Sequence, residues 1–371
     1  MKHVTPEAAI HFTKLSVLLT CSWPPSPLIT KTRLLFFNIL WCTSLVSALG
    51  LFVPLFNAVY EYRKNPIILG KTVSLCAAVA QVIIKMTMCR LQQKQFQVLY
   101  FDMEDFCKRA TSSERIVLQR YVDRYKYFHG VYTLWCFLTT MFVISGPLYS
   151  PQTFPTHAIY PFPVEHQPLK CLIFFHQSLV GFQASSGMAI DAQVALLLRY
   201  TAARFELLAM QLHAATSDRE LNACIKVHSE LLRYTRQVCK CARFLVLATV
   251  TTTIIAVIFG SLNLVTKQPL LLKGLYAVIV FSASVELFMY AWPADNLMRM
   301  SEKIATNAYS TKWFEKNIAI QRKIFFMMLR SQKLEFIYVR GIVPKLSLFY
   351  YAQYLYKSTS YFAALRIMVE K

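Results

Sequence analysis

The stretch LLFFNILWCTSLVSALGLFVPLFNAVY, residues 34–60, contains no charged side chain. A bilayer core of about 30 Å requires roughly 20 mainly apolar residues in a helix to cross it. Six more runs of this kind follow, at residues 67–89, 128–148, 171–198, 244–265, 270–293 and 346–365, the last interrupted by Lys357. The sequence therefore predicts an all-α membrane protein with seven transmembrane helices.

The overall composition favours the same class. Hydrophobic residues make up 56% of the 371 residues and charged residues only 16%, which is too apolar for a soluble protein of this length. Lysine and arginine outnumber aspartate and glutamate by 40 to 19, a net charge of +21. In a soluble protein that excess would suggest nucleic acid, but no basic patch has the interleaved pattern of an RNA-reading module, so no nucleic-acid partner is expected.

The basic residues are divided unequally between the connections, and this predicts the orientation in the membrane. They are frequent before residue 34, between 90 and 127, between 199 and 243 and between 294 and 345. The alternate connections hold few: Arg63 and Lys64 in the first, none from 149 to 167, and Lys267 in the third. Because short cytoplasmic loops are rich in lysine and arginine, we expect the amino terminus inside the cell and the carboxyl terminus outside. The start of the chain lacks a small-residue cleavage site, so we expect no removable signal peptide.

The triplet Asp123, Arg124 and Tyr125 raises an alternative, because many G-protein-coupled receptors carry an acidic-Arg-Tyr triplet at the cytoplasmic end of their third membrane helix. In those receptors the amino terminus is outside and the triplet follows the third span. Here the triplet precedes the third span. We therefore interpret it as a charged turn of a cytoplasmic helix that enters the membrane, and a G-protein-coupled chemoreceptor remains the less favoured reading.

Two cytoplasmic stretches have the start signal of a helix. Ser217 is followed three residues later by Glu220, and Thr111 by Glu114, and each pair has the spacing of a capping box. Apolar residues then recur at helical spacing. We expect helical extensions of the spans that pack on one another or on a neighbouring subunit, with binding of anionic lipid head groups as the alternative.

Nothing in the sequence favours an enzyme. There is no glycine-rich phosphate loop, nucleophile elbow or HExxH motif, and the whole chain has only nine glycines. The ten cysteines are scattered, and Cys239 and Cys241 stand two residues apart on a predicted helix, where side chains face different ways. No catalytic residue, cofactor or metal ligand is predicted.

Four ionisable residues fall inside predicted spans. Lys85 lies near the inner end of its span, and we expect its ammonium group to snorkel toward water. Asp191 and Glu286 fall in the inner halves of theirs, where pairing with a basic group or water is expected. His176 lies in the outer half, where it touches either a ligand or, as we favour, a neighbouring helix.

The carboxyl-terminal third carries three segments in succession: YAWPADNLMRMSEKIATNAYSTKWFE at 290–315, LRSQK at 329–333 and KLSLFYYAQYLYKSTSYFAALR at 345–366. FPTHAIYPFPVE at 154–165 and FQASSGMAIDA at 182–192 stand upstream. With the seven inverted spans, these segments resemble an insect odorant receptor, specifically a ligand-tuning subunit, over nearly the whole chain. An insect gustatory receptor is the alternative, but the tail TSYFAALRI departs from the TYxxxxxQF-like ending of that family.

The resemblance implies a subunit of a ligand-gated, non-selective cation channel. Such subunits form a heterotetramer with a shared odorant receptor co-receptor, bind a small volatile odorant, and lie among membrane lipid in the plasma membrane of olfactory sensory neurons. The implied organisation is a cytoplasmic segment at 1–33, transmembrane helices one to six at 34–293, a cytoplasmic anchor segment at 294–340, and a pore-lining helix with the extracellular carboxyl terminus at 341–371. The chain lacks the long insertion of a co-receptor before span five.

In that family, spans two, three, four and six enclose an odorant pocket in the outer half of the membrane. Candidates at this depth are Val73, Ala77, Phe142, Ser145, Tyr149, Phe174, Gln177, Ser178, Phe182 and Tyr276. Burial of apolar area, about 25 cal/mol per Å², would supply the affinity, and a few polar groups would fix the orientation. Ordinary packing between helices is the alternative for each candidate.

The resemblance also places the narrowest part of the pore on SYFAALRI, residues 360–367. It implies Ala364 and Ile367 at the constriction, with Ser360 and Tyr361 just inward. A helix that carries Lys357 within an apolar run is expected to face protein or water rather than lipid. Alternatively, the helix packs on its partners while the co-receptor sets conduction.

Overall fold

A computed structural model describes residues 4–148, 152–164, 166–265 and 270–370. Within these ranges the chain is built from helices, and its one β-bridge, between Val339 and Val343, is isolated. The α-helices are α1 Pro6–Ser16, α2 Lys31–Glu61, α3 Pro66–Leu91, α4 Gln93–Arg109, α5 Ser112–Ile144, α6 Leu169–Ala214, α7 Asp218–Val265, α8 Leu270–Tyr309, α9 Ile318–Gln332 and α10 Leu348–Glu370. Four 3₁₀ turns join them: η1 Leu18–Thr20, η2 Tyr62–Lys64, η3 Gly146–Leu148 and η4 Trp313–Glu315. The all-α prediction is confirmed.

The seven predicted spans fall in seven separate helices: α2, α3, α5, α6, α7, α8 and α10. Five helical stretches of the described residues are long and apolar enough to cross a membrane by length and composition. They are Lys31–Lys64, Ile68–Leu91, Ser112–Ile144, Asp218–Val265 and Tyr276–Tyr309. Two of the predicted spans are not in this set. One lies in α6, which is buried along most of its length and carries polar side chains toward its neighbours. The other lies in α10.

Both predicted capping boxes are formed. The Thr111 backbone N–H donates to Glu114 Oε2 over 2.8 Å at the start of α5. At the start of α7, the Glu220 N–H donates to Ser217 Oγ over 3.3 Å, and the Ser217 N–H donates to Glu220 Oε2 over 3.1 Å. These caps satisfy backbone donors that the first helical turn leaves free, so the long helices begin where the sequence indicates.

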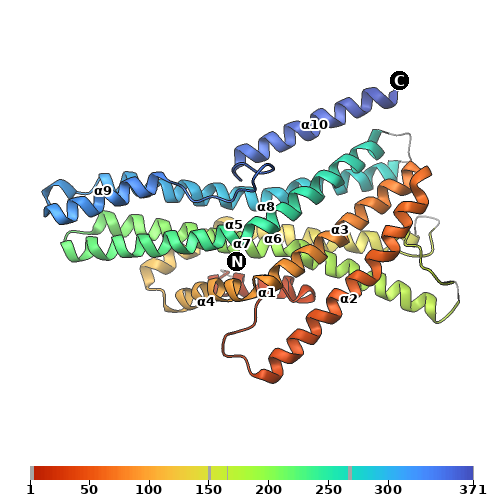
Figure 1. The fold of residues 1–371 in the computed structure, drawn as a ribbon, viewed down its shortest axis with the longest axis horizontal. Coiled ribbons are helices and arrows are strands. Elements are labelled where there is room, and N and C mark those ends of the chain that lie inside the picture. The colour runs from red at the N-terminus through yellow and green to blue at the C-terminus, as the bar shows by residue number, and fades with distance from the viewer. Residues whose placement is uncertain (1–3, 149–151, 165, 266–269, 371) are drawn as a thin grey trace.

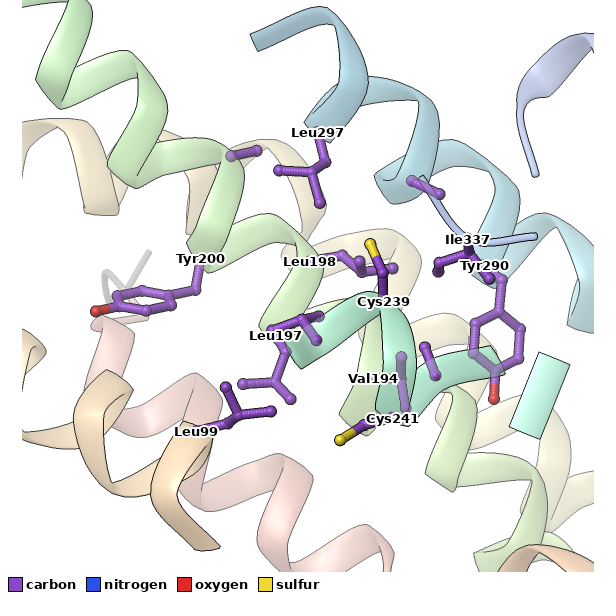
Figure 2. Close-up of a cluster of buried hydrophobic side chains, with 14 of the residues drawn as sticks. Leu99, Val194, Leu197, Leu198, Tyr200, Cys239, Cys241, Tyr290, Leu297 and Ile337 are labelled. Carbon is purple, nitrogen blue, oxygen red and sulfur yellow. The ribbon is translucent and has the colours of Figure 1, made fainter. Parts of the chain in front are cut away.

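The main apolar core joins residues of α1, α3 to α10 and the segment before α10, and a smaller cluster of Leu221, Ala308, Ile320 and Ile324 joins α7, α8 and α9. Figure 2 shows side chains from five segments in the main core: Leu99 of α4, Leu197 of α6, Cys239 of α7, Tyr290 of α8 and Ile337 from the segment after α9. Cys239 and its neighbour Cys241 are buried here as free thiols. Among the described residues, no group of His, Cys, Asp and Glu could hold a metal ion.

Helices α3 and α6 approach each other closely at Gly187. A Cβ atom at this position would lie 2.6 Å from Val82 Cγ2, so only glycine fits without a shift of the neighbour. One turn beyond this contact on each helix stand Lys85 and Asp191. The close approach therefore brings the charged side chains of α3 and α6 within reach of each other.

The last helix begins later than expected. The sequence resemblance placed its start at residue 341, but residues 333–347 form an irregular segment and α10 begins at Leu348. Gly341 has a φ of +83°, in the turn where Val339 and Val343 exchange backbone hydrogen bonds. Figure 1 shows α10 standing off from the other long helices, and its first backbone N–H is tied to Asp295 of α8 over 3.3 Å.

Candidate functional site

A cavity of about 190 Å³ lies among α2, α3, α5, α6, α7 and α8. Most of its lining is apolar or small, including Leu55 of α2, Ala77 of α3, Phe142 of α5, Gly181 of α6 and Ile279 of α8. Small residues keep the space open because their side chains end near the helix surface. The cavity is suited to a compact, largely apolar molecule.

The segment between α5 and α6 covers the cavity. Pro155 and Thr156 line it and are buried, and Gln177 of α6 holds them in place. Gln177 Oε1 accepts from both the backbone N–H and the hydroxyl of Thr156 over 3.0 Å, and its Nε2 donates to the Tyr160 hydroxyl over 3.2 Å. The amide of Gln177 therefore fixes the roof of the cavity.

The serine and threonine hydroxyl groups that line the cavity donate their protons to acceptors within the protein. Thr140 Oγ1 donates to Gly181 O over 3.1 Å, and Ser282 Oγ donates to Val278 O over 2.7 Å. Thr253 donates to Val250 O over 3.1 Å. Since a hydroxyl keeps acceptor capacity after it has donated, these walls offer weak acceptors to a ligand and no unpaired donor proton.

The floor of the cavity carries a buried charge cluster. Lys85 Nζ of α3 lies 2.6 Å from Asp191 Oδ1 of α6 and 2.8 Å from Glu286 Oε1 of α8, and Glu286 also lines the cavity. Gln81 Nε2 donates to Glu286 Oε1, and the Tyr132 hydroxyl donates to Asp191 Oδ2 over 3.2 Å. Lys85 and Asp191 have no exposed side-chain surface.

This cluster ties three helices together, because one ammonium group serves two carboxylates. Buried charges cost several kcal/mol unless they are paired and hydrogen-bonded, and all three groups are. The expectation that Lys85 snorkels to water was wrong. The proximity of α3 and α6 at Gly187 instead supplies an acid within reach. The expected pairing of Asp191 and Glu286 with a basic group is observed.

Three of the ten candidate odorant residues line the cavity: Ala77, Phe142 and Gln177. Tyr149 lies outside the described residues. The other six do not line it and are Val73, Ser145, Phe174, Ser178, Phe182 and Tyr276. Of these, Tyr276 is fully buried between helices, whereas Phe174 faces outward with 36% of its surface exposed. His176 packs on α2, with Nε2 3.1 Å from Ser47 O.

Two helices contribute to the cavity although the resemblance did not implicate them. Leu51 and Leu55 come from α2, and Thr252, Thr253 and Ala256 come from α7. For α7 the run TVTTT at 249–253 is a sequence signal, because clustered hydroxyl residues in an apolar span favour a face turned to protein. The two leucines of α2 carry no comparable signal in the sequence.

The four candidate pore residues lie in the carboxyl-terminal half of α10. Tyr361 and Ile367 have 61% and 60% of their surface exposed, and Ser360 and Ala364 are also exposed. Ser360 Oγ donates to Tyr356 O over 3.0 Å within the helix. The face that contacts the rest of the chain is the other one, where the Tyr351 ring lies 5.2 Å from that of Phe288 in α8.

Comparisons with known proteins agree on one family. Residues 65–352 match the family described as 7tm Odorant receptor. Odorant receptor 10 of Aedes albopictus is 32% identical over 90 residues, which are 24% of this chain and 24% of that receptor. The match thus spans about a quarter of the curated relative's length.

Two solved structures share the fold. The insect olfactory receptor OR5 from Machilis hrabei superposes with a TM-score of 0.79 at 13% sequence identity, and the match covers 96% of this chain and 98% of that one. The same receptor in complex with eugenol gives a TM-score of 0.80 at the same identity and coverage. At this identity the likeness establishes the fold alone.

Proposed function

Because the chain belongs to the odorant receptor family, we propose that it is the odorant-binding subunit of a ligand-gated cation channel assembled with a shared co-receptor. Family membership makes it a multi-pass membrane receptor and not an enzyme. The observation that carries the proposal is the roofed, apolar cavity of about 190 Å³ among six helices. The proposed location is the plasma membrane of olfactory sensory neurons.

The lining of the cavity supports a ligand class. Its walls offer apolar surface and hydroxyl oxygens whose protons are already donated, while Glu286 and Gln81 provide polar groups at the floor. A small, neutral, mainly apolar molecule with one hydroxyl group fits this chemistry, since that hydroxyl could donate to a wall oxygen or to Glu286. Ala77 and Phe142 are the proposed ligand contacts, and Gln177 is proposed to act by holding the roof.

The positions of the helix ends support the proposed orientation. Figure 1 shows the end of α2, the start of α3, the start of α6 and the carboxyl end of α10 at one end of the molecule, and the end of α6, the start of α7 and α9 at the other. The first end is the one poor in lysine and arginine between spans. The positive-inside rule therefore supports an outward orientation of this end, with the cavity in the outer half and the amino terminus inside.

A role for α10 in a pore is supported by its exposed face. Large side chains such as Tyr356 and Ile367, 74% and 60% exposed, project from it away from the rest of the chain. A helix with this much free apolar and hydroxyl surface has room for partner subunits. Ser360, Tyr361, Ala364 and Ile367 are the residues proposed to face the pore.

The proposal is tested by recording from outside-out patches of cells that express this chain with a co-receptor, in nucleotide-free solution. An odorant panel that includes eugenol should evoke a rapid cation current that co-receptor alone lacks. The variant Ala77→Phe fills the cavity and should reduce sensitivity to the active odorant at least about tenfold, since roughly 1.4 kcal/mol of lost binding suffices.

The matched control is Ile84→Phe, which adds a ring on the exposed face of the same helix, where Ile84 is 40% exposed. Its sensitivity should stay at the wild-type level. An odour response that appears only in intact cells and vanishes when G-protein signalling is blocked would reject the channel proposal. A carboxyl-terminal tag that is accessible on intact cells would support the proposed orientation.

A further inference from the structure

A second cavity, of about 270 Å³, lies under the amino-terminal helix and is separate from the first. It is bounded by α1, α4, α5 and α6. Its walls are mainly apolar and include Ile10 and Phe12 of α1, Met103 of α4, and Leu118 and Val122 of α5. None of these residues lines the proposed odorant cavity.

Arg199 of α6 lines this cavity and is only 5% exposed. Its guanidinium carbon lies 4.2 Å from the centroid of the Tyr125 ring. Nη1 lies 3.4 Å from His129 Nδ1, Nη2 lies 3.9 Å from Met289 Sδ, and Nε has no hydrogen-bond partner. A permanently charged group is thus buried among neutral partners with donor capacity to spare.

The hydrogen bond between His129 and Thr13 determines which ring nitrogen of His129 carries the proton. The Thr13 hydroxyl donates to Ala9 O over 2.9 Å, so it accepts the proton of His129 Nε2 at 3.2 Å. This leaves Nδ1 as an acceptor for Arg199, and the imidazole is neutral. His129 therefore orients Arg199 without balancing its charge.

Nearby carboxylates are already paired with other cations. Glu104 lies 2.8 Å from Lys14, Asp123 lies 2.7 Å from Lys126, and Glu206 lies 2.8 Å from Arg120. In the part of the chain that the structure describes, Arg199 forms no ion pair. Since a buried charge without a counter-ion is costly, the site is suited to an anion from outside the chain.

The surroundings indicate that such an anion carries an apolar tail. Leu15 and Leu18 near the end of α1 are 56% and 64% exposed, and Val131 and Leu134 of α5 are 64% and 59% exposed. Apolar side chains exposed on both helices beside the cavity are suited to contact with lipid. An anion with an apolar tail could therefore enter the cavity from the bilayer, with either the tail or the anionic head group leading.

We propose that this cavity is a second ligand site, which binds an amphipathic anion with its carboxylate or phosphate head on Arg199 and its apolar tail along α1 and α5. A free fatty acid and an anionic bilayer lipid share this chemistry. The site is independent of the odorant cavity and of the channel proposal.

The test measures binding of dodecanoate and of 1-dodecanol to the purified full-length chain in neutral detergent. Wild type should bind dodecanoate at least about tenfold more tightly than the alcohol, because only the carboxylate forms an ion pair with the guanidinium group. Arg199→Gln should abolish this preference. Arg204→Gln is the matched control on the same helix, because Arg204 is already close to Asp102, at 3.9 Å, and should keep it. Equal binding of acid and alcohol by wild type, or a preference that survives in Arg199→Gln, would overturn the proposal.

Two further measurements keep the proposal testable if Arg199→Gln fails to fold. A photoreactive dodecanoate analogue should label wild type on α1 or on the 118–122 stretch of α5 in competition with dodecanoate, and labelling confined to other regions would refute the site. Native mass spectrometry then distinguishes the sources. A retained phospholipid identifies a bilayer lipid, and dodecanoate binding without retained phospholipid identifies a free carboxylate. If wild type shows no retained lipid and no preference for dodecanoate over the alcohol, the site is rejected.

Discussion

Lys85 of α3 joins three helices, because its ammonium group bonds carboxylates from two others, α6 and α8. Each carboxylate has a second donor, Gln81 for Glu286 and Tyr132 for Asp191. Removing one member of a buried charge cluster lowers the stability of the fold strongly, whereas replacing all members together with neutral side chains costs little stability. The position of this cluster at the floor of the cavity also links helix packing to the shape of the proposed odorant site.

Replacing Lys85 with Met should leave two buried carboxylates without their cation and lower stability by about 3–5 kcal/mol. The measurement is the melting temperature of the purified receptor in detergent. The triple variant Lys85→Met, Asp191→Asn, Glu286→Gln removes all three charges and should recover most of the loss. A single variant as stable as wild type would contradict the pairing seen here.

His228 predicts a pH dependence outside the predicted spans. It is buried between α7 and α9, and its Nε2 lies 3.1 Å from Ser331 Oγ. Burial, aided by the positive charge of Arg330, lowers the pKa of His228 from 6.5 to about 4. Because the folded pKa is below the unfolded one, the unfolded state binds more protons between these values, so stability is present above pH 6.5 and is lost as pH falls toward 4.

The loss should reach up to about 3 kcal/mol at pH 4, from the 1.36 kcal/mol that one pKa unit represents. Thermal melts of wild type and His228→Gln between pH 7 and 4 check it, since the variant should show a shallower decline. His213→Gln, which changes an exposed histidine near the end of α6, is the control and should follow wild type. Parallel curves for wild type and His228→Gln would refute this assignment.

At the scale of helices, the contact between α3 and α6 decides where the charge cluster forms. Gly187 permits a distance that a side chain would prevent, and Lys85 and Asp191 stand one turn beyond it. Helices α6 and α7 also extend beyond the predicted spans. These extensions contribute side chains to the apolar core that includes Leu197 and Cys239.

Gly187→Ala should destabilise the protein by about 1–3 kcal/mol, because the added methyl group would meet Val82 Cγ2 at 2.6 Å. Val82→Ala in the same chain should relieve the clash and restore part of the loss. A double-mutant cycle of melting temperatures measures this coupling. Strictly additive effects of the two substitutions would show that the helices do not meet at this point.

At the scale of the whole molecule, α10 is the element that the single chain leaves most open. Its exposed residues include Phe349, Tyr356 and Tyr361, at 72%, 74% and 61%. Within the described residues its main helix contacts are with α7 and α8. The proposed tetramer would cover one part of this surface with other subunits and turn another toward the pore.

Ala364→Cys should therefore make the odorant-evoked current of the co-expressed channel sensitive to a charged thiol reagent applied from outside. The expected result is progressive loss of current during application. Ala277→Cys, on an exposed position of α8, is the control and should give a current that the reagent leaves unchanged. Equal resistance of both variants would favour the alternative in which the co-receptor alone lines the pore.

Local features of the sequence were enough for the helices and for the family. Apolar runs predicted seven helices, and the two capping boxes at Thr111 and Ser217 were predicted correctly, because each depends on residues adjacent in the chain. The resemblance misplaced the start of α10 at Gly341, whereas the apolar run at 346–365 began within two residues of Leu348. The orientation and the pore residues remain predictions.

What only the tertiary structure decided is which side chains meet. The sequence placed Lys85, Asp191 and Glu286 inside spans, but their convergence depends on how three helices are rotated and how closely two of them approach at Gly187. The same rotation turned Ala77, Phe142 and Gln177 into the cavity, left Phe174 outside it, and added leucines of α2. Hydropathy and charge fix where a helix lies along the chain, whereas contacts between helices arise from packing across long sequence separations, which a single sequence does not encode locally.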